Sequence, residues 1–356
     1  MRAAVVKSGH LEVVALADPE PGPGQVLVRT LACGICGSDL HAAGDLDHFA
    51  ELTSQAGGPG GLDPAGDLVF GHEFCAEVVS HGPATEGTLQ AGTPVCSVPI
   101  VFGGLGPEAV GYSNAFPGGF GEYMVLQEAM LLPVPDGLAP ERAALTEPLA
   151  VGEHAAGVAR LSSDDVCLVV GAGPVGLAVV AALKRRGHGP VIVAEFSPAR
   201  RRLAEDLGAD FVVDPADISP YSRWSEFGVP ATMMERAMSD FLGGTVRNAV
   251  IFEAVGSPGV LQGVIAGAPP RARIVVVGVC METDRIEPFF AVTKELDIQF
   301  SFGYSAAEFG ATLGHLGSGA LAVDRLVTHE IDLAGLPAAF DALRNPGEYG
   351  KVLVRY

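Results

Sequence analysis

Short apolar runs separated by glycine and proline characterise the first part of the chain, up to about residue 135. Runs such as QVLVRT (25–30), HEFCAEVVS (72–80) and GEYMVLQ (121–127) have the length of β-strands. The turns between them contain Gly and Pro, which end strands and reverse the chain. This pattern is typical of a barrel-like all-β unit.

The pattern changes near residue 145, where apolar strands begin to alternate with helical segments. DVCLVVGAG (165–173) predicts a strand, and PVGLAVVAALKRRG (174–187) predicts a helix with basic residues in its last turn and Gly187 at its end. The alternation continues through VIVAEF, PARRRLAEDLG, FVVD, NAVIFEAVG, RIVVVGV and DIQFSFGY. Strands that alternate with helices predict a doubly wound parallel sheet of the α/β class.

These two patterns divide the chain into two domains. We expect a β-rich domain over residues 1–148 and a doubly wound domain over residues 149–303, meeting at a cleft. The last run, YGKVLVRY (349–356), is strand-like again. Residues 304–356 are therefore expected to return to the first domain and complete it.

Composition narrows the function classes. The chain has 356 residues, 48% of them hydrophobic, with 42 acidic against 22 basic side chains and a formal net charge of −20. This charge repels nucleic acid and anionic membranes, so we expect neither as a partner. The start of the chain lacks a signal-peptide core and no segment reaches membrane-spanning length, which predicts a cytoplasmic protein. There the cysteines are expected to stay reduced.

A dinucleotide-binding motif begins the second domain. GAGPVG places three glycines after a predicted strand and at the start of a predicted helix. In that context the first glycine permits the tight turn, the second lets the backbone approach a pyrophosphate, and the third lets the helix pack on the strand. The residues that we expect to contact the cofactor are Gly171, Gly173, Pro174, Val175, Gly176, Glu195, Arg200, Val277, Gly278 and Val279.

Glu195 ends the next strand, nineteen residues after Gly176, and favours NAD over NADP. Its carboxylate can accept hydrogen bonds from the ribose hydroxyls and would repel a 2′-phosphate. Arg200, Arg201 and Arg202 carry the opposite signal, because arginines there could receive that phosphate. The alternative interpretation makes these arginines the solvated face of a helix.

The chain also contains side chains of the kinds that bind zinc. A thiolate, an imidazole and a carboxylate fill three positions of a tetrahedral zinc and leave the fourth open, as a catalytic site requires. Taken singly, each of these side chains also has a purely structural interpretation, for instance as a buried hydrogen-bonded pair or a helix-packing residue. In chain order the donors are Cys36, His72, Glu73, Glu147, Glu153 and His154.

Cys33 and Cys36 form a C-x-x-C pair, which raises thiol redox chemistry as an alternative function. Such motifs act at a helix N-terminus in a thioredoxin-like βαβ unit. Here the pair follows the β-run QVLVRT, and no second C-x-x-C is present to close a four-cysteine zinc site. We therefore interpret Cys33 as a small buried thiol and Cys36 as a separate metal donor.

Together, CGICGSDLH, GHEF, GGFGEYMV, EPLAVGEHA, GAGPVGL and GKVLVRY make the chain resemble the zinc-dependent medium-chain dehydrogenase/reductase family, in particular its sorbitol, butanediol and threonine dehydrogenases. The resemblance covers essentially the whole chain. It implies a GroES-like β-barrel catalytic domain and a Rossmann domain, with the active site between them. It also implies an NAD-dependent enzyme that interconverts a secondary alcohol, polyol or diol and its ketone or aldehyde, as a homodimer or homotetramer.

The resemblance assigns a metal role to five residues. Cys36, His72 and Glu147 match the family's ligands of the catalytic zinc. Glu73 matches a neighbouring glutamate that binds the zinc or approaches it transiently. Asp39 matches the acid that orients the metal-site histidine. The resemblance therefore implies a zinc ion that acts as a Lewis acid on the substrate oxygen.

Ser38 and His41 match the family's proton relay, which passes the substrate proton through the cofactor ribose to solvent. Two other functions stay open. One is a zinc-free quinone or enoyl reductase, against which the joint presence of the metal donors argues. The other is a non-catalytic NAD(H)-binding protein, against which the relay pair argues.

The sequence departs from the family pattern in two segments. Val98–Pro117 contains no cysteine, where many relatives carry a structural-zinc lobe. The resemblance therefore implies one catalytic zinc and no structural zinc. The segment between His41 and His72 is lengthened, with a Gly-rich stretch within residues 45–66. Such an insertion forms either a mobile flap over the substrate or a passive surface excursion.

Overall fold

The computed structural model describes residues 1–7, 9–104, 106–321, 323–344, 347 and 349–356. These residues form two compact units. Unit 1 contains most of both ends of the chain, namely residues 1–147, 309–320 and 327–356. Unit 2 contains residues 148–308 and 321–326.

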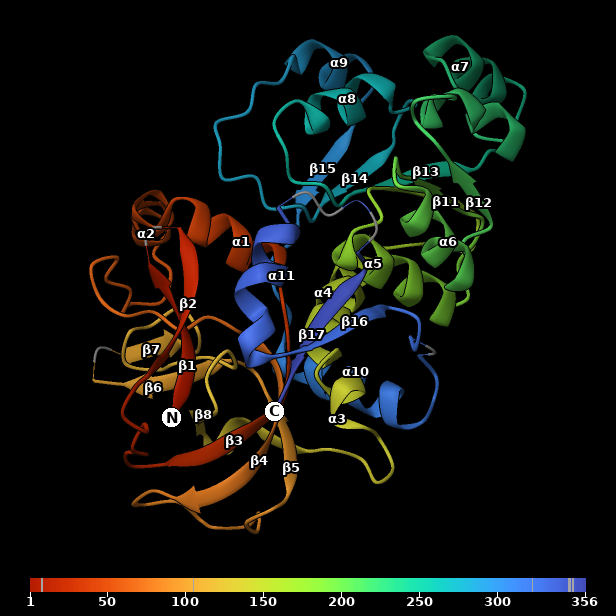
Figure 1. Ribbon diagram of the computed structural model, residues 1–356. Coiled ribbons are helices and arrows are strands. Elements are labelled where there is room, and N and C mark those ends of the chain that lie inside the picture. Colours follow the sequence, from red (N-terminus) through yellow and green to blue (C-terminus); the bar gives the residue numbers. More distant parts are fainter. Residues whose placement is uncertain (8, 105, 322, 345–346, 348) are drawn as a thin grey trace. The chain divides into compact units, whose positions relative to one another are not determined.

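Unit 1 is built on a mixed sheet whose strands come from both ends of the chain (Figure 1). In spatial order its strands are β16 (Val327–Asp332), β17 (Lys351–Arg355), β3 (Gln25–Gly34), β4 (Glu73–His81), β5 (Pro94–Ser97) and β9 (Leu131–Pro133). A further strand, β8 (Tyr123–Gln127), also pairs with β3. The C-terminal strand β17 runs antiparallel to β3, with Val354 opposite Cys33. This pairing brings the end of the chain beside the strand that leads to Cys36.

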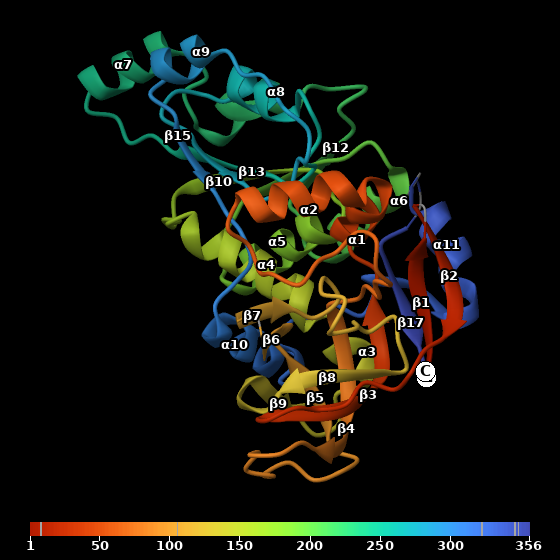
Figure 2. The ribbon, with the colours of Figure 1, turned by 90° about the vertical axis from the view of Figure 1, so that its left-hand side faces the viewer.

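Two hairpins and several short helices complete unit 1. Figure 2 shows β8 beside β3, and the first two helices close together. Buried apolar side chains between the sheet and hairpin β1–β2, among them Phe70, Phe74 and Phe120, form the core. The hairpins and helices are β1 (Arg2–Lys7), β2 (His10–Ala15), β6 (Ile100–Gly103), β7 (Gly106–Ala109), α1 (Gly37–Gly44), α2 (Leu46–Gln55), α3 (Pro140–Ala143) and α11 (Leu336–Ala342).

Unit 2 contains the predicted doubly wound sheet. Within the described residues its strand order is β12 (Phe211–Val213), β11 (Val191–Ala194), β10 (Asp165–Val170), β13 (Asn248–Glu253), β14 (Arg273–Val276) and β15 (Asp297–Phe300). All neighbouring strands are parallel. The strand order reverses between β10 and β13, and ligands of such sheets bind at the carboxyl ends of the strands on either side of that point.

Helices cover this sheet because their apolar faces match its buried strands. Helix α5 (Pro174–Arg185) buries Leu177 and Val180 and is followed by Gly187 at a φ of +75°, the predicted helix end. No helix in the described part of the chain is long and apolar enough to cross a membrane. The other helices of this unit are α4 (Thr146–Val158), α6 (Pro198–Asp206), α7 (Met233–Phe241), α8 (Val260–Gly267) and α9 (Pro288–Thr293), whereas most of α10 (Ala306–Gly317) belongs to unit 1.

Candidate metal and dinucleotide sites

Three of the predicted metal donors come together in unit 1. One ligand atom each from Cys36, His72 and Glu73 lie within 4.8 Å of one another. Cys36 precedes α1, and the other two residues lie at the start of β4. The pairing of Gly34 with Glu73 places the end of β3 next to the start of β4. A thiolate, an imidazole and a carboxylate gathered in this way fit a zinc ion by the chemistry of their donor atoms.

The Asp39 carboxylate lies behind the imidazole of His72. Its Oδ1 is 3.3 Å from His72 Nδ1, and its Oδ2 accepts a hydrogen bond from the Cys36 amide at 3.1 Å. Burial is the largest single influence and lowers the pKa of His72, but the charges of Asp39 and Cys36 and their hydrogen bonds to the imidazole together outweigh it and raise that pKa well above its ordinary value. The imidazole thus lies where a bound cation, either a proton or a metal ion, is stabilised.

A buried lysine engages Glu73. Lys351 Nζ lies 2.6 Å from each Glu73 carboxylate oxygen and donates a further hydrogen bond to the Ile35 carbonyl at 3.1 Å. Burial is the largest single influence and lowers the pKa of Lys351, but the charges of Glu73, Cys36 and Glu147 and the hydrogen bond to Glu73 together outweigh it, and the pKa is raised. The sequence did not indicate this partner, because GKVLVRY was interpreted as a strand and as a family motif without a role for its lysine. A lysine inside an apolar strand is the signal that indicates a buried countercharge.

Glu147 lies in the first turn of α4 and is buried. It is not part of the group of donor atoms formed by Cys36, His72 and Glu73. Its charge nevertheless contributes to the raised pKa of Lys351, so its carboxylate lies within electrostatic reach of the Lys351–Glu73 pair.

Glu153 and His154 form ion pairs within unit 2. Glu153 accepts hydrogen bonds from Arg185 at 2.6 Å and from Arg186 at 3.0 Å. His154 Nδ1 lies 3.1 Å from Glu308. These contacts support the structural interpretation of both residues.

The predicted relay residues lie on α1. Ser38 and His41 are three positions apart and therefore neighbours on the helix surface. His41 is exposed, whereas Ser38 is partly buried. Cys33 is fully buried, and burial raises the pKa of its thiol well above its ordinary value. A thiol in that state is a poor redox partner for Cys36, in agreement with the sequence analysis.

The inserted segment 45–66 is tied to residues 112–114 of the same unit. It contains α2, whose Phe49 ring lies 5.3 Å from the Tyr112 ring, centroid to centroid. Asn114 Oδ1 accepts a hydrogen bond from the backbone amide of Asp63 at 2.7 Å. The backbone amide of Asn114 donates to the Gly61 carbonyl at 3.0 Å. The insertion therefore packs against Tyr112 and Asn114 of the same unit.

The glycine-rich motif lies between β10 and α5, at the carboxyl ends of the strands. Gly171 has a φ of +93°, and a Cβ atom on Gly176 would lie 2.0 Å from the Gly171 carbonyl oxygen. Neither position therefore accepts a side chain. Pro174 begins α5, so free amides at the helix N-terminus face the loop. This is the geometry that holds a pyrophosphate.

Glu195 is fixed beside this loop by backbone amides. Its Oε2 accepts a hydrogen bond from the Ala172 amide at 2.8 Å, and its Oε1 accepts one from the Ser197 amide at 2.8 Å. These bonds hold a negative charge where the sequence analysis places the ribose.

The three arginines of α6 have different surroundings. Arg201 forms an ion pair with Asp214 at 2.8 Å and donates to the Glu195 carbonyl at 2.8 Å. Arg200 is half-buried near the glycine-rich loop, and desolvation lowers its pKa. Arg202 alone is exposed, so the solvated-face interpretation applies to it and not to the other two.

Val277, Gly278 and Val279 follow β14, at the same edge of the sheet as the glycine-rich loop. The amides of Val277 and Gly278 donate to the Glu253 carbonyl at 2.8 and 2.9 Å. Val279 is exposed. Strand β13 separates β14 from β10 in this sheet. Within unit 2, the residues after β14 therefore lie at the sheet edge that also carries the predicted pyrophosphate site.

The chain has the features of a zinc-type dehydrogenase. Unit 1 is a GroES-like fold with zinc donors, and unit 2 is a Rossmann sheet with a dinucleotide loop. Two family models match it: "Alcohol dehydrogenase GroES-like domain" over residues 22–136 and "Zinc-binding dehydrogenase" over residues 174–317. The chain therefore belongs to the zinc-dependent medium-chain alcohol dehydrogenase family, as the motifs predict.

Individual relatives agree with this assignment. (R,R)-Butanediol dehydrogenase of Bacillus subtilis (strain 168) is 33% identical over 97% of this chain and 96% of its own length. A zinc-binding dehydrogenase of Sinorhizobium meliloti 1021, solved with NADP, has a TM-score of 0.79 and 26% identity over 100% of this chain and 99% of its own. An alcohol dehydrogenase of Escherichia coli CFT073, solved with NADH, has a TM-score of 0.80 and 25% identity over 100% and 99%.

The chain is thus an oxidoreductase that interconverts an alcohol and its carbonyl product. Its cofactors are zinc and a nicotinamide nucleotide, and its substrate is a small molecule. Neither the zinc-free reductase nor the non-catalytic alternative finds support in these relationships.

Proposed function

We propose that this dehydrogenase oxidises a secondary alcohol or a vicinal diol with NAD, using one zinc ion held by Cys36, His72 and Glu147. The observation that carries the proposal is the gathering of Cys36, His72 and Glu73, with Asp39 behind the imidazole. When they are bound, zinc supplies a Lewis acid for the substrate oxygen and the nicotinamide ring supplies the hydride acceptor.

The choice of Glu147 as third ligand rests on the contacts of Glu73. Lys351 approaches both Glu73 oxygens at 2.6 Å, so Glu73 already has a partner for its charge. A catalytic site needs three protein ligands and an open position, and Glu147 is the remaining candidate because Glu153 is paired with Arg185 and Arg186. The absence of cysteine from Val98–Pro117 supports one zinc per chain rather than two.

Ser38 and His41 carry the proton in this proposal. Ser38 follows the ligand Cys36 by two residues, so its hydroxyl is suited to accept a hydrogen bond from the substrate hydroxyl. His41 is exposed on the same helix and can release the proton to solvent. Asp39 keeps His72 oriented through the contact at 3.3 Å.

The substrate class follows from the relative with known chemistry. The Bacillus subtilis relative acts on (R,R)-butanediol, which carries two adjacent secondary hydroxyl groups. The test is NADH formation from a panel of secondary alcohols, vicinal diols, sorbitol and threonine. We expect the highest kcat/KM with a secondary alcohol or a diol. Turnover confined to primary alcohols, or none with any alcohol, would contradict the proposal.

The NAD preference rests on Glu195. Its carboxylate is held by the Ala172 and Ser197 amides, so it cannot move away from a 2′-phosphate without breaking both bonds. Arg200 lies nearby and would favour a phosphate, but its partial burial makes it less available. Repulsion by a fixed carboxylate therefore favours NAD.

Glu195→Gln is expected to lower the preference for NAD over NADP by about tenfold, which corresponds to about 1.4 kcal/mol. The change removes the charge and keeps the shape, although the glutamine NH2 group cannot accept a hydrogen bond, so only one of the two amide contacts is kept. The measurement is the ratio of kcat/KM for the two nucleotides. Glu205→Gln, at an exposed position of the following helix α6, is the control and should leave the ratio unchanged. An unchanged ratio in Glu195→Gln would argue against its role.

A homodimer through the edge of unit 2 is part of the proposal. Strand β15 is the last strand of its sheet in the described residues, so one row of its amides and carbonyls faces away from β14. Phe300 and Phe302 at its end are 71% and 88% exposed. On α9, Phe289 and Val292 are 72% and 75% exposed. Such an apolar edge strand is suited to antiparallel pairing with its own copy around a two-fold axis.

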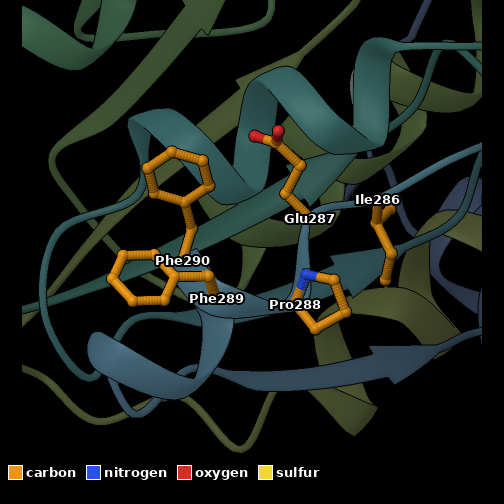
Figure 3. A pocket seen from close by; sticks show the side chains of 5 residues that line it. All are labelled: Ile286, Glu287, Pro288, Phe289 and Phe290. Atoms are coloured by element: carbon orange, nitrogen blue, oxygen red, sulfur yellow. The ribbon is translucent and has the colours of Figure 1, made fainter.

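A hollow of about 520 Å³ lies beside these residues, at the start of α9. Figure 3 shows its lining, in which the rings of two adjacent phenylalanines stand near Pro288. An apolar hollow of this kind can receive a side chain from a second copy. Its lining residues are Ile286, Glu287, Pro288, Phe289 and Phe290.

The double variant Phe300→Asp/Phe302→Asp is expected to be monomeric, because two charges from each chain, buried at a two-fold interface, cost several kcal/mol. Sedimentation velocity measures the change. Phe241→Asp on α7, where the side chain is 86% exposed, introduces the same charge elsewhere and should leave the dimer intact. A double variant that keeps the oligomeric state of the wild type would refute the interface.

A further inference from the structure

Tyr112 connects two residues of the metal site through one hydroxyl group. Its Oη lies 2.9 Å from Ser38 Oγ and 2.9 Å from Asp39 Oδ1. Tyr112 follows β7, 74 positions after Ser38 in the chain, in the cysteine-free segment. The motifs of the sequence contain no signal for it, because only the fold brings the two segments together.

Aromatic side chains fix the ring of Tyr112. Phe49 and His72 each place a ring centroid 5.3 Å from it, and Phe70 places one at 5.4 Å. Phe49 belongs to the inserted helix α2, whereas Phe70 lies just before β4. Since the ring is enclosed on these sides, its hydroxyl group has little freedom to leave Ser38 and Asp39.

The number of protons sets the direction of the two hydrogen bonds. A phenol carries one proton, and a carboxylate can only accept. Tyr112 therefore donates its proton to Asp39, where a charged acceptor makes the stronger bond. Its oxygen can then only accept from Ser38, so the Ser38 hydroxyl donates to Tyr112 until Ser38 takes up the substrate proton, when it turns to pass its own proton along the relay. The lone pairs of Ser38 Oγ consequently remain available to accept a hydrogen bond from a substrate hydroxyl.

We propose that Tyr112 is a positioning residue of this dehydrogenase, which holds Ser38 as a hydrogen-bond acceptor for the substrate hydroxyl. This inference rests on the proposed function, in which Ser38 receives the substrate proton. Tyr112 acts through Ser38 and not by contact with substrate or cofactor. Through Phe49 the inserted segment takes part in the same positioning, which gives the insertion a role beside the site.

Tyr112→Phe tests the inference, because it keeps the ring and removes only the hydroxyl group. We expect kcat to fall by about 10- to 100-fold, the usual effect of losing a group that orients a site residue. KM should change by less than about threefold, because the lost interaction acts in the reaction step. Zinc content and NADH affinity should equal those of the wild type.

Tyr356→Phe is the matched control. It removes another phenol hydrogen bond of unit 1, donated to the Gly119 carbonyl at 2.8 Å, and that phenol has no contact with Ser38. Both variants should lose a similar small amount of thermal stability, whereas only Tyr112→Phe should lose kcat. A Tyr112→Phe enzyme with wild-type kcat would overturn the inference.

A double-mutant cycle with Ser38→Ala separates positioning from an independent role. If Tyr112 acts through Ser38, Tyr112→Phe should change kcat by less than about twofold in the Ser38→Ala background. Effects that multiply in the double variant would overturn the inference. The cycle also distinguishes a failure of this inference from a failure of the proposed function. A slow Ser38→Ala with a normal Tyr112→Phe refutes the inference alone, whereas a fully active Ser38→Ala refutes the proposed proton path as well.

Discussion

Replacing Cys36 by serine is expected to remove zinc and to lower kcat by about a thousandfold or more. A serine hydroxyl does not ionise near neutral pH and is a poor zinc ligand, whereas a thiolate is a strong one. The Lewis acid that depends on this ligand is worth several kcal/mol in the reaction step, and each 1.4 kcal/mol is a factor of about ten. The measurements are metal content by mass spectrometry and initial rates of NADH formation.

The same variant should bind NADH as tightly as the wild type, because the glycine-rich loop and Glu195 belong to unit 2. Fluorescence titration of NADH measures this and shows that the variant is folded. Cys280→Ser makes the same chemical change at a partly exposed cysteine and should retain its zinc. Full turnover by a zinc-free Cys36→Ser enzyme would contradict the mechanism.

Replacing Lys351 by methionine is expected to destabilise the protein by about 3–5 kcal/mol, the usual cost of leaving a buried charge without its partner. Lys351 and Glu73 are 3% and 1% exposed, so water cannot replace the missing ammonium group. Methionine keeps most of the volume of the lysine stem, which limits the effect of a cavity. Urea unfolding, followed by circular dichroism, measures the change.

Two further variants define the origin of that loss. Lys351→Met/Glu73→Gln should recover much of the stability, because the double change removes both charges. Lys184→Met breaks the pair with Asp210, whose side chains are 30% and 37% exposed, and should cost less than about 1 kcal/mol. Equal losses for Lys351→Met and Lys184→Met would show that the buried pair is not a special contributor.

The sequence predicted the doubly wound sheet well, for a physical reason. Strands buried on both faces are continuous apolar runs, and the helices between them have a different period, so both can be recognised locally. VIVAEF and RIVVVGV, for example, became β11 and β14. The glycine-rich motif was equally clear, because Gly171 and Gly176 tolerate no side chain in the observed turn.

The contacts that complete the metal site could not be predicted in the same way. Lys351 reaches Glu73 because β17 pairs with β3 and β3 pairs with β4, and that register depends on the packing of the whole sheet. Tyr112 reaches Ser38 because a segment after β7 packs over α1. Motifs report residues that act within short stretches of sequence, and these partners lie more than 70 positions away.

The arginines of α6 show a different limit of prediction from the sequence. From the sequence, the three residues were interpreted together, with a phosphate site and a solvated helix face as the two alternatives. In the structure Arg201 is bound to Asp214, Arg200 is half-buried, and only Arg202 is exposed. On a helix, adjacent residues point in directions about 100° apart, so a run of like charges cannot share one environment.

The central claim is that Cys36 and His72, with one carboxylate, hold a single catalytic zinc. X-ray absorption at the zinc edge of the purified enzyme tests it most directly, together with the zinc content of the same sample. The account predicts about one zinc per chain, with one sulfur ligand at about 2.3 Å and nitrogen or oxygen ligands at about 2.0–2.2 Å. A zinc surrounded by several sulfur atoms, or an active enzyme without zinc, would contradict it.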